Sequence, residues 1–234
     1  ELCSQIKNRY GIEVAHHLTC RGLSSTNIDA ILSKMREQNI HNILALRGDP
    51  PREEPEFVPH KNGYQYANEL VKHIHDFGGF NIGVAGYPEP HKESPNTETD
   101  MINLKRKIDA GADVVFTQLF YDNSHFYQFV ERCQDMNIST PIIPGLMPLI
   151  SLEQILRIST ACGASIPSNL LRSLKEAKGD KDRIYDISVE HTSNQALDLL
   201  KNGVPGIHFY VLNDSSRVAS VMERVNSFVT QTPT

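Results

Sequence analysis

The chain has 234 residues, of which 39% are hydrophobic and 22% charged, and its net charge at pH 7 is −5. This length suits one sizeable core, so we expect a single domain over residues 1–234. The negative charge without a basic block argues against nucleic acid and anionic membranes as partners, and no apolar run approaches the roughly 20 residues of a transmembrane helix.

Six short apolar segments recur along the chain, and each ends in polar or turn-forming residues. They span residues 12–20, 42–49, 81–88, 113–121, 140–148 and 206–214. Each is a strand candidate, and helical patterns separate them. Near-continuously apolar strands that alternate with helices predict a parallel sheet covered on its outer face. The wider gap before the last strand is expected to hold further helices at 151–161, 167–177 and 182–201.

The helix after the first strand illustrates the pattern. Residues 28–35 place apolar side chains at i, i+3, i+4 and i+7, which predicts a helix. We expect Ser24, Ser25 or Thr26 to cap its start. Asp29 is expected to lie in its first turn.

Two architectures suit this alternation, a doubly wound open sheet and a (β/α)8 barrel. Every expected strand carries polar or special residues at its carboxyl end, which is the active face of a barrel. They are Thr19 and Cys20, Arg47 and Asp49, Tyr87 and Glu89, Gln118, Met147 with Pro148, and Asn213 with Asp214. An open sheet usually marks its ligand site with a Gly-rich turn, and no G-x-G-x-x-G occurs. The pattern favours an α/β fold of the (β/α)8 TIM barrel type, with about six of the eight βα units visible.

Arg47-Gly48-Asp49 spells the short tripeptide of cell-adhesion proteins, and it follows an apolar run directly. An adhesion site would need an exposed loop of a secreted protein, and nothing else in the sequence supports that role. At the end of a barrel strand, the same residues would reach the active face.

Two further segments leave their roles open. The Pro-rich, acidic connection 49–63 is either part of a rim or lid or a tolerated surface insertion. Helix 96–110 carries a polar stripe that is either solvated surface or a cationic, hydrogen-bonding edge for a diphosphate and a ribose. The stripe consists of Asp100, Asn103 and Lys107, with Arg106 beside it.

Cysteine and histidine spacing bears on metals and on the cellular compartment. The cysteines are Cys3, Cys20, Cys133 and Cys162. They form no C-x-x-C pair, which favours a reducing compartment, so we predict a cytoplasmic protein. His16 and His17 are neighbours on an expected strand, and His73 and His75 are two apart on an expected helix, so each pair diverges. We therefore predict no metal site.

Several ordered strand-end motifs together resemble the methylenetetrahydrofolate reductase family, and the match runs across nearly the whole chain. They are HLTC (17–20), LALRGD (44–49), VAGYPEPH (84–91), NLKRKIDAGAD (103–113), TQLFYD (117–122), IIPGLMP (142–148) and HFYVLN (208–213). The resemblance implies a (β/α)8 barrel with FAD that reduces 5,10-methylenetetrahydrofolate to 5-methyltetrahydrofolate. Its electrons would come from NADH or NADPH in a ping-pong cycle. Such an enzyme is an oxidoreductase of one-carbon metabolism.

The resemblance also implies site residues. The positions matching the family's FAD contacts are His17, Arg47, Gly48, Asp49, Tyr66, Ala67, Ala85, Tyr87, His91, Asp100, Asn103, Arg106 and Lys107. Gln118 matches a residue shared by folate and nicotinamide in turn, and Gln154 matches a folate contact. Asp49 would act catalytically, because its charge stabilises a cationic iminium form of the folate.

The sequence also departs from the family pattern. The family's proton-donating Glu and its first two strands would lie before Glu1, so we expect a chain whose beginning is missing and which holds strands 3 to 8. Asp214 stands where the family often has an Arg, and it would repel the folate's glutamate tail. Ile158 replaces an aromatic that stacks on the nicotinamide in some members. The alternative is an FAD-binding barrel fragment without reductase activity, and in either case we expect a homo-oligomer.

Overall fold

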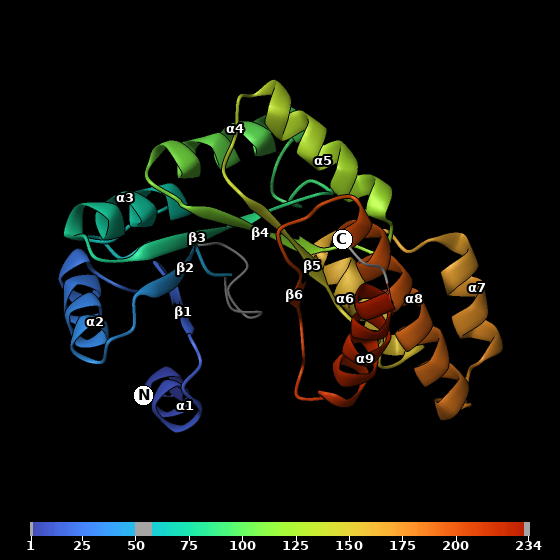
Figure 1. Cartoon of the computed structure of the whole chain (residues 1–234). Helices are drawn as coiled ribbons and strands as arrows, with labels where there is room; N and C mark the ends of the chain where they lie inside the picture. The colour runs from blue at the N-terminus through green and yellow to red at the C-terminus, as the bar shows by residue number, and fades with distance from the viewer. Residues whose placement is uncertain (1, 50–57, 232–234) are drawn as a thin grey trace. The chain divides into compact units, whose positions relative to one another are not determined.

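The computed structural model describes residues 2–49 and 58–231, in which strands alternate with helices (Figure 1). The strands are β1 (Ala15–Thr19), β2 (Asn42–Leu46), β3 (Asn81–Gly86), β4 (Val114–Leu119), β5 (Ile142–Leu146) and β6 (His208–Phe209). The helices are α1 (Leu2–Tyr10), α2 (Ser25–Glu37), α3 (Ala67–Phe77), α4 (Thr97–Asp109), α5 (Asn123–Asp135), α6 (Leu152–Cys162), α7 (Ser168–Glu176), α8 (Lys181–Lys201) and α9 (Ser216–Gln231). Each strand and helix named from the sequence has a counterpart in the described part of the chain, although the last strand is much shorter than expected.

The six strands follow one another in the sheet in chain order, from β1 to β6. The pairs β1 with β2, β2 with β3, and β5 with β6 are parallel. A doubly wound sheet reverses its strand order at a switch point, whereas a barrel keeps consecutive strands adjacent. The order therefore confirms the expected α/β barrel fold, with six of the eight βα units in this chain.

The chain divides into two compact units. The first comprises Glu1–Ala85, Met101–Val115 and Ile138–Pro141, and the second comprises Gly86–Asp100, Phe116–Asn137 and Ile142–Thr234. Each unit has its own buried apolar side chains, so each can position its own part of a site.

In the first unit, β2 packs against α3. Ile43 and Ala45 are 2% and 1% exposed, while the alternate residues of the strand, Asn42, Leu44 and Leu46, are half-buried. This alternation follows from the strand's period of two, which turns every second side chain toward the helices. Leu70 and Ile74 of α3 are fully buried in the same unit.

Ser24 is the residue that caps α2, as one of the three options expected from the sequence. Its hydroxyl accepts a hydrogen bond from the Asn27 backbone N–H at 3.1 Å, and the Asn27 side-chain oxygen accepts one from the Ser24 N–H at 3.1 Å. The expectation for Asp29 is wrong, because a helix that begins at Ser25 leaves it outside the first turn. Asp29 instead contacts His73 of α3, with 2.8 Å between Oδ1 and Nε2.

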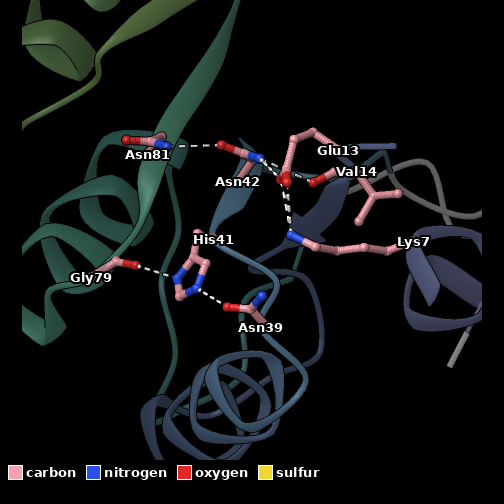
Figure 2. Close-up of polar contacts among 8 residues, drawn as sticks. All are labelled: Lys7, Glu13, Val14, Asn39, His41, Asn42, Gly79 and Asn81. Carbon is pink, nitrogen blue, oxygen red and sulfur yellow. Dashed lines mark hydrogen bonds and ion pairs between the residues drawn. The ribbon is translucent and has the colours of Figure 1, made fainter. Parts of the chain in front are cut away.

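A ladder of side chains crosses the amino ends of the first three strands (Figure 2). The Asn81 amide donates to the Asn42 oxygen at 2.8 Å, and the Asn42 amide donates to the Glu13 carboxylate at 3.4 Å. Lys7 of α1 completes the ladder with an ion pair to Glu13 at 2.9 Å. The ladder supports the register in which Asn42 lies opposite both Ala15 and Asn81. It lies at the end of the strands opposite to the active face of a barrel, where polar residues serve stability.

In the second unit, hydrogen bonds beside Thr117 join segments that are distant in the sequence. The Gly145 N–H donates to the Thr117 hydroxyl at 2.9 Å, and the Tyr210 hydroxyl donates to the Thr117 carbonyl at 2.9 Å. On the surface, the Asp198 carboxylate of α8 accepts from the Tyr127 hydroxyl of α5 at 2.6 Å. These bonds hold β4, β5 and the segment after β6 together, along with the helices that cover them.

The last expected strand is wrong over most of its length. Only His208 and Phe209 form β6, opposite Gly145 and Leu146. The chain then turns, because Asn213 adopts a φ of 62°. The apolar pair before it, Val211 and Leu212, resembles a strand in the sequence but is 39% and 51% exposed.

His191 of α8 predicts a pH-dependent stability for the second unit. Within the described part of the chain, its Nε2 atom is buried without a hydrogen-bond partner. Burial lowers the imidazole pKa from its ordinary 6.5, although a backbone hydrogen bond with Tyr121 and the charge of Asp122 oppose the shift. Below about pH 6.5, the unfolded chain takes up a proton on His191 that the folded protein resists, so the free energy of unfolding should fall as the pH drops.

His191→Gln should flatten this dependence, because glutamine does not titrate. The measurement is urea denaturation between about pH 7.5 and pH 5.5, with the exposed His75→Gln as control. If His191→Gln keeps the wild-type slope of stability against pH, the assignment to His191 is contradicted.

Candidate functional site

The Arg-Gly-Asp turn follows β2 directly and belongs to the first unit. Gly48 adopts a φ of +89°, and a Cβ there would lie 3.1 Å from the Thr19 Cβ and 3.2 Å from the Arg21 Cβ. Glycine is therefore favoured by both backbone conformation and space. The next residue, Asp49, is exposed. The turn thus presents a carboxylate to solvent from a backbone that packs closely on the end of β1.

Four further expected residues of this unit lie on strands or at the start of α3. His17 is exposed on β1, and Ala85 is half-buried at the end of β3. Tyr66 is 51% exposed, and its backbone N–H donates to the Glu69 carboxylate at 3.0 Å. This hydrogen bond fixes the start of α3, where Ala67 is the first residue, while the Tyr66 side chain remains available for contact.

The first unit also carries most of the polar stripe on α4. The Arg106 guanidinium donates to the Asn103 side-chain oxygen at 3.0 Å, and the Lys107 ammonium donates to the Ala85 carbonyl at 2.5 Å. Asn103 and Arg106 are exposed, and Lys107 is half-buried. Because the Asn103 oxygen is neutral, this bond does not cancel the charge of Arg106. Cationic N–H groups of this kind suit phosphate oxygens.

In the second unit, the loop after β3 brings Tyr87 and His91 together. Their rings meet edge to face, with 4.8 Å between centroids and 72° between planes. The His91 Nδ1 atom accepts from the Glu93 N–H at 3.2 Å, which fixes the ring orientation. Asp100, on the first turn of α4, is only 8% exposed.

The two glutamines expected to contact substrate also lie in the second unit. The Gln118 side-chain oxygen accepts from the Leu119 N–H at 3.0 Å, and the Gln154 oxygen accepts from the Ile150 N–H at 3.0 Å. Each side-chain oxygen is therefore turned toward the backbone N–H of a residue nearby in the sequence. A substrate that uses either oxygen must compete with this bond, whereas one that accepts from the amide N–H groups need not.

Asp214 has intramolecular partners that the sequence does not reveal. Its carboxylate accepts from the Ser216 N–H at 3.1 Å and forms an ion pair with Arg217. Hydrogen bonds from Ser216 and the charge of Arg217 lower the Asp214 pKa. The guanidinium of Arg217 also covers the Tyr185 ring, 5.0 Å from its centroid. The negative charge is thus paired, which weakens any repulsion of a nearby anion.

Sequence reasoning missed a contact network around Glu89 in the second unit. The Glu89 carboxylate accepts from the Ser165 N–H at 2.9 Å and lies 3.6 Å from the His125 Nε2 atom. It ties the loop with Tyr87 and His91 to the segment after α6. The sequence places Glu89 near the end of a strand, but it does not indicate that Ser165 and His125 are its partners.

Several expectations concern neighbouring features. Ile158 of α6 is half-buried and packs on a core cluster. The expected rim at 49–63 falls mainly on residues 50–57, which lie outside the described residues.

Among residues 2–49 and 58–231, no group of three potential ligands could hold a metal ion. No helix in that part of the chain is long and apolar enough to cross a membrane.

Comparison with known proteins gives matches over nearly the whole chain. The sequence profile of the methylenetetrahydrofolate reductase family matches residues 1–226. Methylenetetrahydrofolate reductase (NADH) 1 of Arabidopsis thaliana is 36% identical over 95% of this chain and 40% of its own length. The 5,10-methylenetetrahydrofolate reductase of Pectobacterium carotovorum is 34% identical over 89% of this chain and 68% of its own length. The chain thus spans less than half of the plant protein.

A solved structure supports the fold. An uncharacterized protein from Clostridium thermocellum, which binds two copies of 5-methyl-5,6,7,8-tetrahydrofolic acid, superposes with a TM-score of 0.61. The alignment covers 97% of this chain and 78% of that one, at 14% identity. At this identity the likeness concerns the fold alone.

Proposed function

Because this chain belongs to the methylenetetrahydrofolate reductase family, we propose that it is the catalytic region of an FAD-dependent enzyme that reduces 5,10-methylenetetrahydrofolate to 5-methyltetrahydrofolate. The observation that carries the proposal is the family match over residues 1–226. We propose NADH or NADPH as electron donor, and the name of the plant relative favours NADH. A cytoplasmic location and a homo-oligomeric assembly remain predictions.

The residues present fit FAD in three observed respects. Gly48 leaves out a Cβ where the turn is crowded, the exposed Tyr66 offers an aromatic ring, and Arg106 offers a cation whose recorded partner is neutral. We propose that the residues expected from the resemblance hold the cofactor. In the first unit they are His17, Arg47, Gly48, Asp49, Tyr66, Ala67, Ala85, Asn103, Arg106 and Lys107, and in the second they are Tyr87, His91 and Asp100. When bound, FAD supplies the hydride chemistry between nicotinamide and folate.

Asp49 would contribute charge stabilisation. A folate that has opened to its iminium form carries a positive charge, and a carboxylate close to it lowers the energy of that state. At about 4 Å and an effective dielectric of about 20, the Coulomb energy is about 4 kcal/mol before desolvation is subtracted. The exposed position of Asp49 at a strand end is compatible with this role.

Gln118 and Gln154 would bind substrate through their amides. We propose that Gln118 serves folate and nicotinamide in turn and that Gln154 serves folate. Because the side-chain oxygen of each accepts a backbone hydrogen bond, their N–H groups are the parts best oriented to donate. The pairing of Asp214 with Arg217 reduces the repulsion that we expected for the glutamate tail.

The test is the colour and redox behaviour of the purified full-length protein. We expect a yellow protein whose flavin absorbance is bleached anaerobically by NADH or NADPH and restored by 5,10-methylenetetrahydrofolate. Colour that returns only with artificial acceptors would favour an FAD-binding protein without reductase activity. A full-length protein without flavin would overturn the proposal.

A further inference from the structure

Residues at the end of β1 contact every residue of the turn 47–49, which follows β2. The Cys20 N–H donates to the Leu46 carbonyl at 3.2 Å, and the Cys20 thiol donates to the Arg47 carbonyl at 3.3 Å. The Arg21 guanidinium donates through Nη1 to the Asp49 carbonyl at 3.0 Å. The packing of Gly48 on the Cβ atoms at the end of β1 completes this set of contacts. We call the three side chains Thr19, Cys20 and Arg21 the β1 clamp.

The Cys20 thiol of the clamp is in its donor form near neutral pH. Cys20 is fully buried, and burial raises the pKa of its thiol to about 11. The thiol therefore stays protonated near neutral pH and can keep donating to the Arg47 carbonyl. Cys20 fixes the first half of the turn, but it does not reach Asp49.

A separate contact is needed to fix the position of Asp49. Glycine has more backbone freedom than other residues, so Gly48 by itself does not fix the direction in which Asp49 leaves the strand. The Asp49 side chain is exposed and gains little from packing. Among the contacts recorded for the described residues, the Arg21 guanidinium is the group in the clamp that hydrogen-bonds to Asp49.

We propose that Arg21 is a positioning residue, which sets the placement of the Asp49 carboxylate through the Asp49 backbone. The inference rests on the proposed function of Asp49 in folate reduction. A charged donor to a carbonyl makes a stronger hydrogen bond than a neutral one. Displacing a catalytic group by about 1 Å can slow a reaction on the order of 100-fold. Arg21 can therefore affect the rate through Asp49 without contacting the substrate.

The experiment combines Arg21→Ala and Arg21→Lys with Asp49→Asn in the full-length protein. Arg21→Ala should slow the turnover of the folate substrate at saturation about 10-fold, while kcat/KM for NADH, which reports the separate flavin-reduction half of the ping-pong cycle, stays unchanged. Arg21→Lys, which keeps a charged donor, should recover most of the loss. In the Asp49→Asn background, Arg21→Ala should have almost no further effect, because the carboxylate it positions is gone. Exposed Arg172→Ala on α7 is the matched control.

The double mutant separates positioning from other roles. Equal losses from Arg21→Ala with and without Asp49, or wild-type rates in Arg21→Ala, would overturn the proposal. A rise in KM for NADH or weaker FAD binding would instead show that Arg21 binds a ligand directly, which also overturns it.

A second measurement does not depend on activity. Hydrogen exchange of the backbone amides at 47–49, followed by mass spectrometry, should be faster in Arg21→Ala than in wild type or Arg21→Lys. Unchanged exchange would refute the clamp even in a protein that reduces folate. If wild type shows no folate reduction while exchange responds as expected, the proposed function fails and the clamp stands.

Discussion

Replacing Asp49 with asparagine should leave FAD bound and slow the reduction of 5,10-methylenetetrahydrofolate on the order of 100-fold. Asparagine keeps the size of the side chain and its hydrogen-bonding oxygen, so the turn around Gly48 should persist. It removes the negative charge that we propose stabilises the cationic folate. If about 2.7 kcal/mol of the Coulomb energy remains after the cost of desolvation is subtracted, its loss slows the reaction about 100-fold.

The measurement compares two activities of the same variant. NADH oxidation with an artificial acceptor such as menadione should change little, because it does not require a cationic folate. Reduction of 5,10-methylenetetrahydrofolate should carry nearly the whole loss. The control is Asp186→Asn, which removes a carboxylate from the exposed face of α8. Equal loss of both activities, or loss of neither, would contradict the role of Asp49.

The sequence predicts the strand ends of this fold well because local patterns encode them. An apolar run that stops at polar residues marks the end of a buried strand, and this pattern placed Arg47, Asp49 and Gln118 at their strand ends. It failed for β6, where the apolar pair Val211 and Leu212 continues the pattern but lies exposed beyond the paired residues. Pairing with a neighbouring strand, not hydrophobicity, decides where such a strand ends.

The partners of site residues could not be predicted in the same way. The clamp exists because Thr19 pairs with Leu46, which places Arg21 beside Asp49, 28 residues further along the chain. No local period encodes that register. The bond from Leu119 to the Gln118 amide is similar, since a side chain that folds back on its own backbone leaves no pattern in the sequence.

Gly145→Ala should destabilise the second unit by about 3 kcal/mol or more, the largest effect on stability that we expect from a single methyl group. A Cβ at this buried position would lie 2.4 Å from the Thr117 carbonyl oxygen and 2.7 Å from the Tyr210 Cε2 atom. The carbonyl is backbone and cannot rotate away. Its oxygen already accepts from the Tyr210 hydroxyl at 2.9 Å, so the ring cannot withdraw without losing that bond.

The same substitution should disturb the candidate site, because Gln118 directly follows Thr117. We expect the KM for the folate substrate to rise in whatever fraction remains folded, while FAD contacts in the first unit are spared. Urea denaturation gives the stability, and steady-state kinetics gives the KM. Gly206→Ala is the matched control, because a Cβ there meets nothing within 4 Å and its effect should stay within about 1 kcal/mol.

Tyr210→Phe tests how much of the Gly145→Ala effect comes from the contact between the new methyl group and the Tyr210 ring, as opposed to the Thr117 carbonyl oxygen. This change removes the hydroxyl that bonds to the Thr117 carbonyl, so it should cost about 1 kcal/mol alone, as a typical buried hydrogen bond does. In the Gly145→Ala background it should cost less, because the ring is then able to move away from the new methyl group. If Gly145→Ala unfolds at the same urea concentration as Gly206→Ala, the close packing of β5 on Thr117 and Tyr210 is wrong.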